Sequence, residues 1–404
     1  MFMPLGLYIS VPFCRSKCSY CNFASDVFSR TVFERYVDRV CRDIQLARET
    51  AEQMGGRFER AVDSVYLGGG TPTVLDITQL ERLFVTISQH FEVLPGAEVT
   101  VECAPGTLTP AMLETLARCR VNRVSLGVQS FVDLEAASVG RLHQRATVAD
   151  DIAGLRAAGI SNINIDLIAG LPHQTRESWQ VSVAETIACG APHASVYMLE
   201  VDDDSRLGRE LMAGGTRYHA HFVPDEEVTA DLYEMACEQL DAADVRQYEI
   251  SNFARECHES RHNLKYWTRQ PYLGFGVDAH SMLEAETVEH DSNSAGNWEA
   301  VRFATPDSLE AYLGGVPGSR TPVSHHAALE EGFFLGLRLI RGVNLPKIRE
   351  EFGAQAATAF AEPIAELVQA KLLLHENGVI RLTPRGRLLS NEVFQRFISA
   401  TEGV

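Results

Sequence analysis

The chain has 404 residues, 45% of them hydrophobic and 22% charged, so it can bury a sizeable core and is not expected to be disordered. Its 54 acidic residues outnumber its 36 Lys and Arg, and the formal net charge of -18 argues against nucleic acid as a partner. No apolar run approaches the roughly 20 residues that span a bilayer, although peripheral membrane contact stays open. The nine cysteines, with three packed into one short segment, do not suggest a disulfide framework and indicate a reducing cytoplasm.

Six short segments rich in β-branched and apolar residues alternate with longer stretches of helical periodicity. A helix predicted to begin near Thr31 places Phe33, Tyr36, Val40 and Ile44 on one face. The alternation predicts an α/β fold of parallel strands, either an open (β/α)6 partial barrel or a doubly wound sheet. In both, the loops at the carboxyl ends of the strands build the site. The predicted strands are residues 5–9, 64–67, 98–102, 123–128, 162–167 and 194–199.

The pattern changes after the sixth predicted strand, which divides the chain into three parts. We expect a core over residues 1–240 and an extension or junction over residues 241–320. The extension holds a strand-like run at 246–253, followed by a polar, aromatic stretch with few regular elements. Residues 321–404 form a third part.

This third part shows the periodicity of helices and then of a hairpin. Helices are predicted at 326–340 and 345–352, and a short strand pair within 372–382 turns around Asn377 and Gly378. Helices followed by a hairpin predict a small winged-helix-like C-terminal module.

Three cysteines directly after the first predicted strand have the spacing C-x3-C-x2-C. Iron–sulfur clusters normally take four thiolates, so Cys14, Cys18 and Cys21 would leave one iron open to another ligand. One alternative is a structural zinc site, but such a site would need a fourth Cys or His close by. The other alternative is that the three cysteines are unrelated buried residues. The spacing favours a cluster with an open position.

The same spacing, with Tyr20 before the last cysteine, resembles the radical S-adenosylmethionine (SAM) superfamily. The resemblance implies a [4Fe–4S] cluster on Cys14, Cys18 and Cys21, SAM on the open iron, and an electron donor for the cluster. It also favours the (β/α)6 partial barrel. In that superfamily the reduced cluster cleaves SAM to methionine and a 5′-deoxyadenosyl radical, so the cofactors supply the difficult chemistry.

A glycine-rich loop and an acidic strand end follow the next two predicted strands. Gly68, Gly69 and Gly70 precede Thr71, and consecutive glycines let the backbone approach a ligand closely. This segment resembles the superfamily loop that binds the SAM amino group, with a plain turn as the alternative. Glu102 ends its strand, where its carboxylate either accepts hydrogen bonds from a ribose diol or faces solvent.

A longer set of residues at strand ends resembles the coproporphyrinogen III oxidase subfamily. The resemblance rests on segments 125–131, 140–143 and 170–172 and on Asp166. Taken singly, these residues have plainer interpretations, as a strand-end hydrogen bonder, a surface cation or a helix cap. The subfamily implies one SAM in contact with Tyr8, Gly69 and Glu102, and a second in contact with Gln129, Arg141 and Asp166.

Two further features depart from the oxidase and resemble HemW-type haem chaperones. Phe23 stands where the oxidase has a fourth cysteine, and the 13 residues before Cys14 are too few for the arm that closes the oxidase site. Residues 262–267 match an H-N-x-x-Y-W motif, which implies haem as cargo, because imidazole is a common axial ligand. In the alternative, the motif ties down an irregular loop and fills the domain junction. The haem candidates are His262, Tyr266 and Trp267.

The leading hypothesis is a chaperone of the HemW type that binds haem, a [4Fe–4S] cluster and SAM and transfers haem to respiratory acceptor proteins. The alternative is an enzyme, either an oxidative decarboxylase of coproporphyrinogen III or a two-SAM methyltransferase. Phe23 and the short start disfavour the first, and the H-N-x-x-Y-W motif disfavours the second. No catalytic residue is assigned; the number of SAM molecules, the haem ligand, membrane association and a homodimer stay open.

Overall fold

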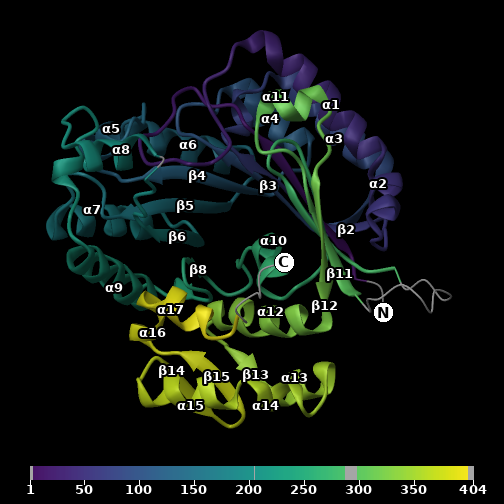
Figure 1. The fold of residues 1–404 in the computed structure, drawn as a ribbon. Helices are drawn as coiled ribbons and strands as arrows, with labels where there is room; N and C mark the ends of the chain where they lie inside the picture. Colours follow the sequence, from purple (N-terminus) through teal and green to yellow (C-terminus); the bar gives the residue numbers. More distant parts are fainter. Residues whose placement is uncertain (1–2, 204, 287–297, 399–404) are drawn as a thin grey trace.

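The computed structural model describes residues 3–203, 205–286 and 298–398. Over these residues one twelve-stranded sheet, in the order β12-β11-β10-β9-β1-β2-β3-β4-β5-β6-β8-β7, curves into an arch (Figure 1). Its centre consists of six parallel strands in sequence order: β1 (Leu5–Val11), β2 (Ala61–Gly69), β3 (Glu92–Cys103), β4 (Arg123–Gln129), β5 (Asn162–Ala169) and β6 (His193–Met198).

The strand order decides between the two architectures that the sequence left open. A doubly wound sheet reverses its strand order at a switch point, whereas these six strands follow one another without reversal. The prediction of an open (β/α)6 partial barrel is therefore confirmed. The helices of this half cover the outer face of the arch (Figure 1): α1 (Phe33–Gln45), α2 (Ala47–Met54), α3 (Ile77–His90), α4 (Pro110–Arg118), α5 (Asp133–Ser138), α6 (Arg145–Ala157), α7 (Arg176–Ala188), α8 (Arg206–Ala213) and α9 (Glu226–Ala242).

Three 3-10 turns and two edge extensions complete the arch. The turns are η1 (Arg30–Val32), η2 (Pro72–Val74) and η3 (Ala220–Phe222). At one edge β9 (Tyr272–Phe275) pairs in parallel with β1, and β10 (His280–Glu284), β11 (Trp298–Ala304) and β12 (Ser319–Ser324) continue antiparallel, with α11 (Leu309–Gly314) between the last two. At the other edge β8 (Asn252–Ala254) and β7 (Arg246–Gln247) pair antiparallel.

The sequence between residue 253 and the C-terminal module carries few signals of regular elements, yet the described residues there form four strands. Strands β9 to β12 lie there, but they are short and partly exposed, so their apolar pattern is weak. The first three residues of β12 are all exposed, for example. Pairing of β9 with β1, and of each further strand with the one before it, stabilises these segments, and periodicity does not report such pairing.

Side chains alternate between two faces along the central strands. On β4 the outward residues Val124, Leu126 and Val128 are fully buried in the core beneath the helices. The residues between them point inward, because successive side chains of a strand face opposite sides. These inward residues line a cavity: Arg123, Ser125, Gly127 and Gln129.

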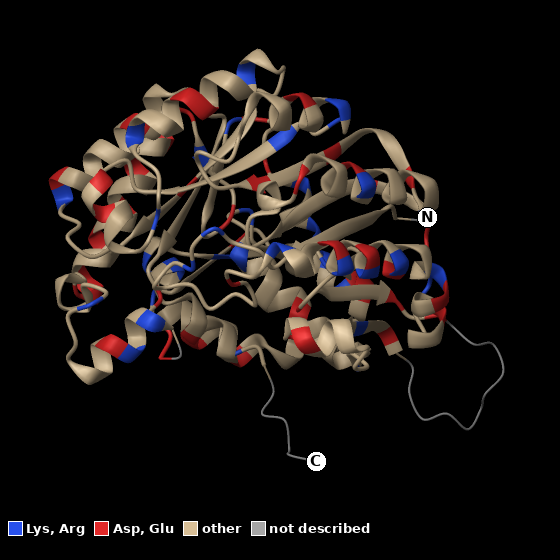
Figure 2. Ribbon diagram, turned by 90° about the horizontal axis from the view of Figure 1, so that it is seen from above, with Lys and Arg blue, Asp and Glu red and all other residues tan. Residues whose placement is uncertain are grey.

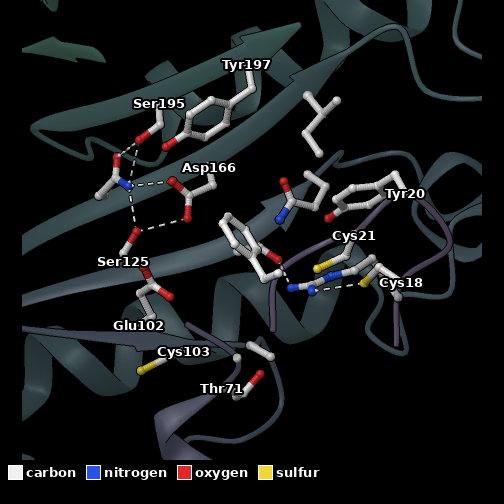
Figure 3. Close-up of a pocket in the computed structure, with 18 of the residues that line it drawn as sticks. Cys18, Tyr20, Cys21, Thr71, Glu102, Cys103, Ser125, Asp166, Ser195 and Tyr197 are labelled. Carbon is white, nitrogen blue, oxygen red and sulfur yellow. Dashed lines mark hydrogen bonds between the residues drawn. The ribbon is translucent and has the colours of Figure 1, made fainter. Parts of the chain in front are cut away.

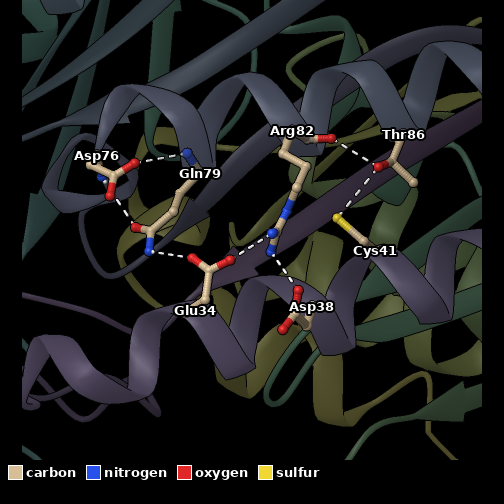
Figure 4. A network of polar contacts seen from close by, with 7 residues as sticks. All are labelled: Glu34, Asp38, Cys41, Asp76, Gln79, Arg82 and Thr86. Atoms are coloured by element: carbon tan, nitrogen blue, oxygen red, sulfur yellow. Dashed lines mark hydrogen bonds and ion pairs between the residues drawn. The ribbon is translucent and has the colours of Figure 1, made fainter.

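Helices α1 and α3 pack side by side on the outer face. The apolar stripe predicted for α1 is buried, although the helix begins at Phe33, after η1. Asp76 caps α3 through a capping box with Gln79. Between the helices, Arg82 pairs with Glu34 at 2.6 Å and Asp38 at 2.8 Å (Figure 4). These exposed pairs orient the helices but contribute little stability.

Charges of both signs are spread over the outer helices rather than gathered on one side (Figure 2). The net charge of -18 is thus distributed over the surface. In the part of the chain that the structure describes, every helix is too short or too polar to cross a membrane.

The C-terminal module closes the open side of the arch (Figure 1). Helix α12 (His325–Arg338) contacts β11 and β12, and the small sheet of the module has the strand order β13-β15-β14. The predicted helices and hairpin are present, with a core of their own. The remaining elements are β13 (Val343–Asn344), α13 (Leu345–Phe352), α14 (Ala356–Ala359), α15 (Ala361–Gln369), β14 (Leu373–Glu376), β15 (Val379–Leu382), α16 (Pro384–Leu388) and α17 (Ser390–Gln395).

Candidate functional site

The inner face of the arch encloses a cavity of about 800 Å³. Its walls come from the loop after β1, from the ends of β2 to β6, and from the C-terminal module, which contributes Arg338 and Asn391. Figure 3 shows Glu102, Ser125 and Asp166 on the strands, with Cys18 and Cys21 on the loop across from them. Loops at the carboxyl ends of parallel strands therefore meet here, as the sequence predicted.

The loop after β1 brings all three motif cysteines to the cavity wall. Cys18 is 7% exposed, Cys14 and Cys21 are half-buried, and none forms a disulfide. Backbone hydrogen bonds fix the loop: the Cys14 amide donates to Asp26 at 3.0 Å, and the Cys21 amide donates to the Cys18 carbonyl at 3.4 Å. The thiols are thus presented inward by a folded loop.

Polar donors accompany two of these sulfur atoms. Thr71 Oγ1 lies 4.0 Å from Cys14 Sγ, and Arg141 Nη1 donates to Cys18 Sγ at 3.6 Å. Burial raises the pKa of the Cys14 thiol. Burial lowers the pKa of Arg141, but negative charge on Cys18 and Tyr20 outweighs it and leaves the pKa raised. Arg141 is therefore a permanent cation beside the cysteine loop.

The glycine loop after β2 lies against Glu102. A Cβ at Gly68 would come within 2.8 Å of Glu102 Oε1, so glycine is needed for this close approach. Gly69 has φ +97, a conformation that favours glycine, and Tyr8 Oη lies 3.4 Å from where its Cβ would be. Tyr66 Oη donates to Glu102 Oε1 at 2.8 Å. Burial raises the pKa of Glu102 to about 7.

Gln129 and Asp166 lie on neighbouring strands of the same wall. Gln129 has φ 70, and its buried Oε1 has no hydrogen-bond partner among the described residues. Asp166 accepts hydrogen bonds from Ser125 Oγ at 2.9 Å and Asn164 Nδ2 at 2.7 Å (Figure 3). Burial raises the pKa of Asp166. The SAM candidates Gly69, Gly70, Thr71, Glu102, Gln129, Arg141 and Asp166 all line this cavity.

Tyr8 is not among the lining residues, although it lies on the inner face of β1. Its ring is tilted against those of Tyr66 and His262, with centroids 6.1 and 6.4 Å away. Burial, together with the charge of Glu102, raises the pKa of Tyr8. The Tyr8 hydroxyl reaches the site only at the glycine loop.

The H-N-x-x-Y-W motif forms a short helix, α10 (Arg261–Trp267), inside the arch (Figure 1). The amides of Arg261 and His262 donate to the Glu98 carboxylate at 3.0 and 3.1 Å, which caps the helix. Lys265 pairs with Asp63 at 2.8 Å beside the start of β2. Helix α10 is therefore anchored at the amino ends of the strands, away from the cysteine loop.

The imidazole of His262 is 1% exposed and already has two partners. Nδ1 hydrogen-bonds with Ser64 Oγ at 3.0 Å, and Nε2 hydrogen-bonds with Tyr266 Oη at 2.8 Å. Burial, followed by the charge of Lys265, lowers the pKa of His262 to about 3, so the ring is neutral. A bond from either nitrogen to a haem iron would require one of these hydrogen bonds to break.

The structure does not bring the three haem candidates to the cavity wall. Within the motif only Asn263 lines the cavity, and Trp267 instead packs under the guanidinium of Arg338, 4.2 Å from the ring centroid. This geometry corresponds to the alternative in which the motif fills a junction. The motif forms a helix rather than the irregular loop of that alternative, and its sequence does not say at which end of the barrel it lies.

Family models match two parts of this chain. The Radical SAM superfamily model matches residues 8–184, and the HemN C-terminal domain model matches residues 323–389. Among curated proteins, the chain is 32% identical over 400 residues to the heme chaperone HemW of Lactococcus lactis, covering 98% of this chain and 97% of that protein. This chain belongs to the HemW family of radical SAM proteins.

Other relatives extend the same comparison. The heme chaperone HemW of Synechocystis is 34% identical over 360 residues, covering 86% of this chain and 82% of that protein. The coproporphyrinogen III oxidase of Escherichia coli, a radical SAM enzyme, superposes with a TM-score of 0.80 at 22% identity, covering 98% of this chain and 90% of that one. At that identity the oxidase supports the fold alone.

Membership of the radical SAM superfamily implies a [4Fe–4S] cluster and SAM, and the residues of the site fit both. Three free thiols face one cavity, and no three described His, Cys, Asp or Glu side chains converge tightly enough for a single metal ion. A cluster spreads its ligands further apart than one ion does. The orphaned Oε1 of Gln129 offers an acceptor to a ligand amine or hydroxyl.

Outside the cysteine loop, sequence reasoning missed two cations of the cavity wall. Arg123 begins β4, and Arg338 ends α12. Arg123 could have been found from the alternation along β4, because every second residue faces the same side and residue 123 is in step with Ser125 and Gln129. Arg338 gave no such signal, because its place in the cavity depends on how the C-terminal module docks.

Proposed function

We propose that this protein is a haem chaperone, which binds haem and transfers it to acceptor proteins while holding a [4Fe–4S] cluster and SAM. The identity of 32% over nearly the whole of both chains with a curated heme chaperone carries this proposal. The activity takes place in the cytoplasm or at a membrane surface, and it requires an electron donor for the cluster and respiratory proteins as haem acceptors.

The proposal assigns the cluster to Cys14, Cys18 and Cys21. Arg141 stabilises a thiolate at Cys18 through its 3.6 Å hydrogen bond and its permanent charge. The loop, fixed through its backbone, holds all three sulfur atoms at one side of the cavity and leaves the strand ends facing them. When bound, the cluster and SAM supply electron transfer and reductive cleavage of the sulfonium.

SAM is assigned to the strand-end wall opposite these cysteines. The Glu102 carboxylate accepts hydrogen bonds from a vicinal diol, and the hydrogen bond from Tyr66 fixes its orientation. The remaining contacts are assigned to the glycine loop and to the polar ends of β4 and β5: Tyr8, Gly69, Gly70, Thr71, Gln129, Arg141 and Asp166.

The mouth of the cavity has an apolar surface suited to a flat macrocycle. Phe23 is 71% exposed and Leu142 is 73% exposed, and both line the cavity. Exposed large apolar side chains at a cavity mouth favour an apolar ligand or partner. The assignment of haem itself to His262, Tyr266 or Trp267 stays a prediction that requires α10 to rearrange.

The second candidate is a radical SAM enzyme acting on coproporphyrinogen III, which rests on the resemblance of segments 125–131, 140–143 and 170–172 to the oxidase subfamily. Phe23 argues against it, because the oxidase subfamily has a cysteine there. A two-SAM methyltransferase is supported only by the set of strand-end residues.

Anaerobic reconstitution followed by two assays on one sample separates these functions. The first assay titrates haem by its Soret absorbance, and the second measures decarboxylation of coproporphyrinogen III with SAM and a reductant. Stoichiometric haem binding without multiple turnovers supports the chaperone. Product formation at enzymatic turnover contradicts it.

A further inference from the structure

Arg123 lies at the start of β4 and is 2% exposed. Its side chain faces the cavity, and its buried Nε has no hydrogen-bond partner among the described residues. Among the described residues, no carboxylate forms an ion pair with Arg123 within 4.0 Å. A guanidinium cannot shed its charge in a protein, so this is a buried cation without a direct partner.

Two carboxylates that are influenced by the charge of Arg123 are already engaged with other donors. Arg123 acts on Glu102 and Asp166 through its charge, as the lowering effect on their pKa values indicates. However, Glu102 accepts from Tyr66, and Asp166 accepts from Ser125 and Asn164. Burying a charge is costly unless hydrogen-bonded partners satisfy it, so the open donors of Arg123 favour an anionic group inside the cavity.

We propose that Arg123 binds a carboxylate of the ligand that enters this cavity. A planar guanidinium matches the two oxygens of a carboxylate, and such charge-assisted pairs are among the strongest hydrogen bonds. In a haem chaperone this carboxylate is a haem propionate, an identification that rests on the proposed function.

Arg123 lies far from the cysteine loop, so the carboxylate that it binds differs from a carboxylate of SAM bound at the cluster. Arg123 and Gln129 are the two ends of β4, and six residues of strand span about 20 Å. The cysteine loop lies at the Gln129 end, where Arg141 joins Gly127 and Cys18. A group held by Arg123 therefore lies deep in the cavity rather than at the cluster.

Arg338 offers a second cation on the facing wall. It lines the same cavity, and its buried Nε also lacks a partner among the described residues. Its Nη2 pairs with Glu249 at 3.3 Å, and its guanidinium lies over Trp267, so the side chain is held in place. Because Arg338 already has a carboxylate partner in Glu249, Arg123 is the cation to which the proposal assigns the ligand carboxylate.

The test compares haem with its dimethyl ester, in which both propionates lack charge. Wild type, Arg123→Gln and the control Arg118→Gln, an exposed residue of α4, are reconstituted anaerobically with the cluster and titrated with each compound. The wild type and the control should bind haem about ten- to a hundredfold more tightly than the ester. Arg123→Gln should bind haem as weakly as the ester, with an unchanged cluster spectrum. SAM affinity is measured at pH 9, where Glu102 is ionised with or without the charge of Arg123, and it should be unchanged there. Arg123→Lys, which keeps the charge, should recover part of the preference.

The other possible results each contradict either the haem propionate assignment or the proposed function. Wild-type preference for haem in Arg123→Gln would overturn the proposal and leave the haem function intact. If the wild type binds no haem, the proposed function fails. Equilibrium dialysis with SAM then tests whether Arg123 binds a ligand carboxylate at all. Loss of SAM affinity in Arg123→Gln would then assign the carboxylate to SAM, whereas unchanged SAM affinity would overturn the carboxylate site.

Discussion

The imidazole of His262 stacks on the phenol ring of Tyr66, with ring centroids 5.3 Å apart and planes inclined by 28°. Tyr66 in turn donates its hydroxyl hydrogen bond to Glu102, on the wall assigned to SAM. Helix α10, at the amino ends of the strands, therefore contacts the glycine-loop wall through the ring of Tyr66. His262 is a positioning residue in this arrangement.

Replacing His262 with alanine should weaken SAM binding without removing the cluster. The variant loses the hydrogen bonds with Ser64 and Tyr266 and leaves a cavity beneath Tyr66, which together cost about 2–4 kcal/mol of stability. SAM affinity by equilibrium dialysis and the unfolding midpoint measure the two effects. His375→Ala, at an exposed position of β14, is the control. Unchanged SAM affinity in a destabilised His262→Ala would show that the stack is only structural.

Glu102 should make SAM binding depend on pH near neutrality. Burial raises the pKa of Glu102 to about 7, and an acceptor of diol hydrogen bonds works best when ionised. SAM affinity should therefore rise with pH, by about tenfold between pH 6 and pH 8, as the ionised fraction grows. Because the folded protein holds this proton above the ordinary pKa of 4.5, the stability contributed by Glu102 is present below that pH and is lost as the pH rises to about 7. A Glu102→Gln variant should bind more weakly, with a flat profile; an unchanged slope would remove Glu102 from the site.

Cys18→Ser should abolish the [4Fe–4S] cluster. The sulfur of Cys18 is a proposed ligand and contacts Arg141, whereas the control Cys119 lies on the outer side at the end of α4. The broad visible absorbance of the cluster and iron content per chain provide the measurement. Cys119→Ala should retain both, and a full cluster in Cys18→Ser would contradict the ligand assignment.

The ion pair between Lys265 and Asp63 should be needed to hold α10. The side chain of Lys265 is 3% exposed, and its stem packs so closely on β1 that a Cβ at Gly6 would lie 2.8 Å from its Cδ. Lys265→Met keeps the stem but leaves Asp63 unpaired, which should cost about 3 kcal/mol in chemical denaturation. Lys265→Met with Asp63→Asn should recover most of this loss. Equal loss in the single and double variants would assign the effect to packing alone.

The sequence predicted the six parallel strands and the convergence of their loops, because apolar periodicity and cysteine spacing are local signals. It did not predict β9 to β12, which extend the sheet from β1 through β9, each strand pairing with the one before it. It also did not predict where His262 lies, because the H-N-x-x-Y-W sequence does not specify at which end of the barrel the motif packs. Arg123 was overlooked because a single buried cation stands out only when its missing partners are known.

Transfer of haem to an acceptor is the measurement that tests the chaperone function most directly. Reconstituted protein loaded with haem is mixed with a haem-free b-type cytochrome, and the two are separated and scored by absorbance, with free haem plus albumin as the control for simple dissociation. We expect stoichiometric loading of the protein with haem and transfer to the cytochrome faster than loss to albumin. Failure to bind haem, or transfer no faster than dissociation, would contradict it.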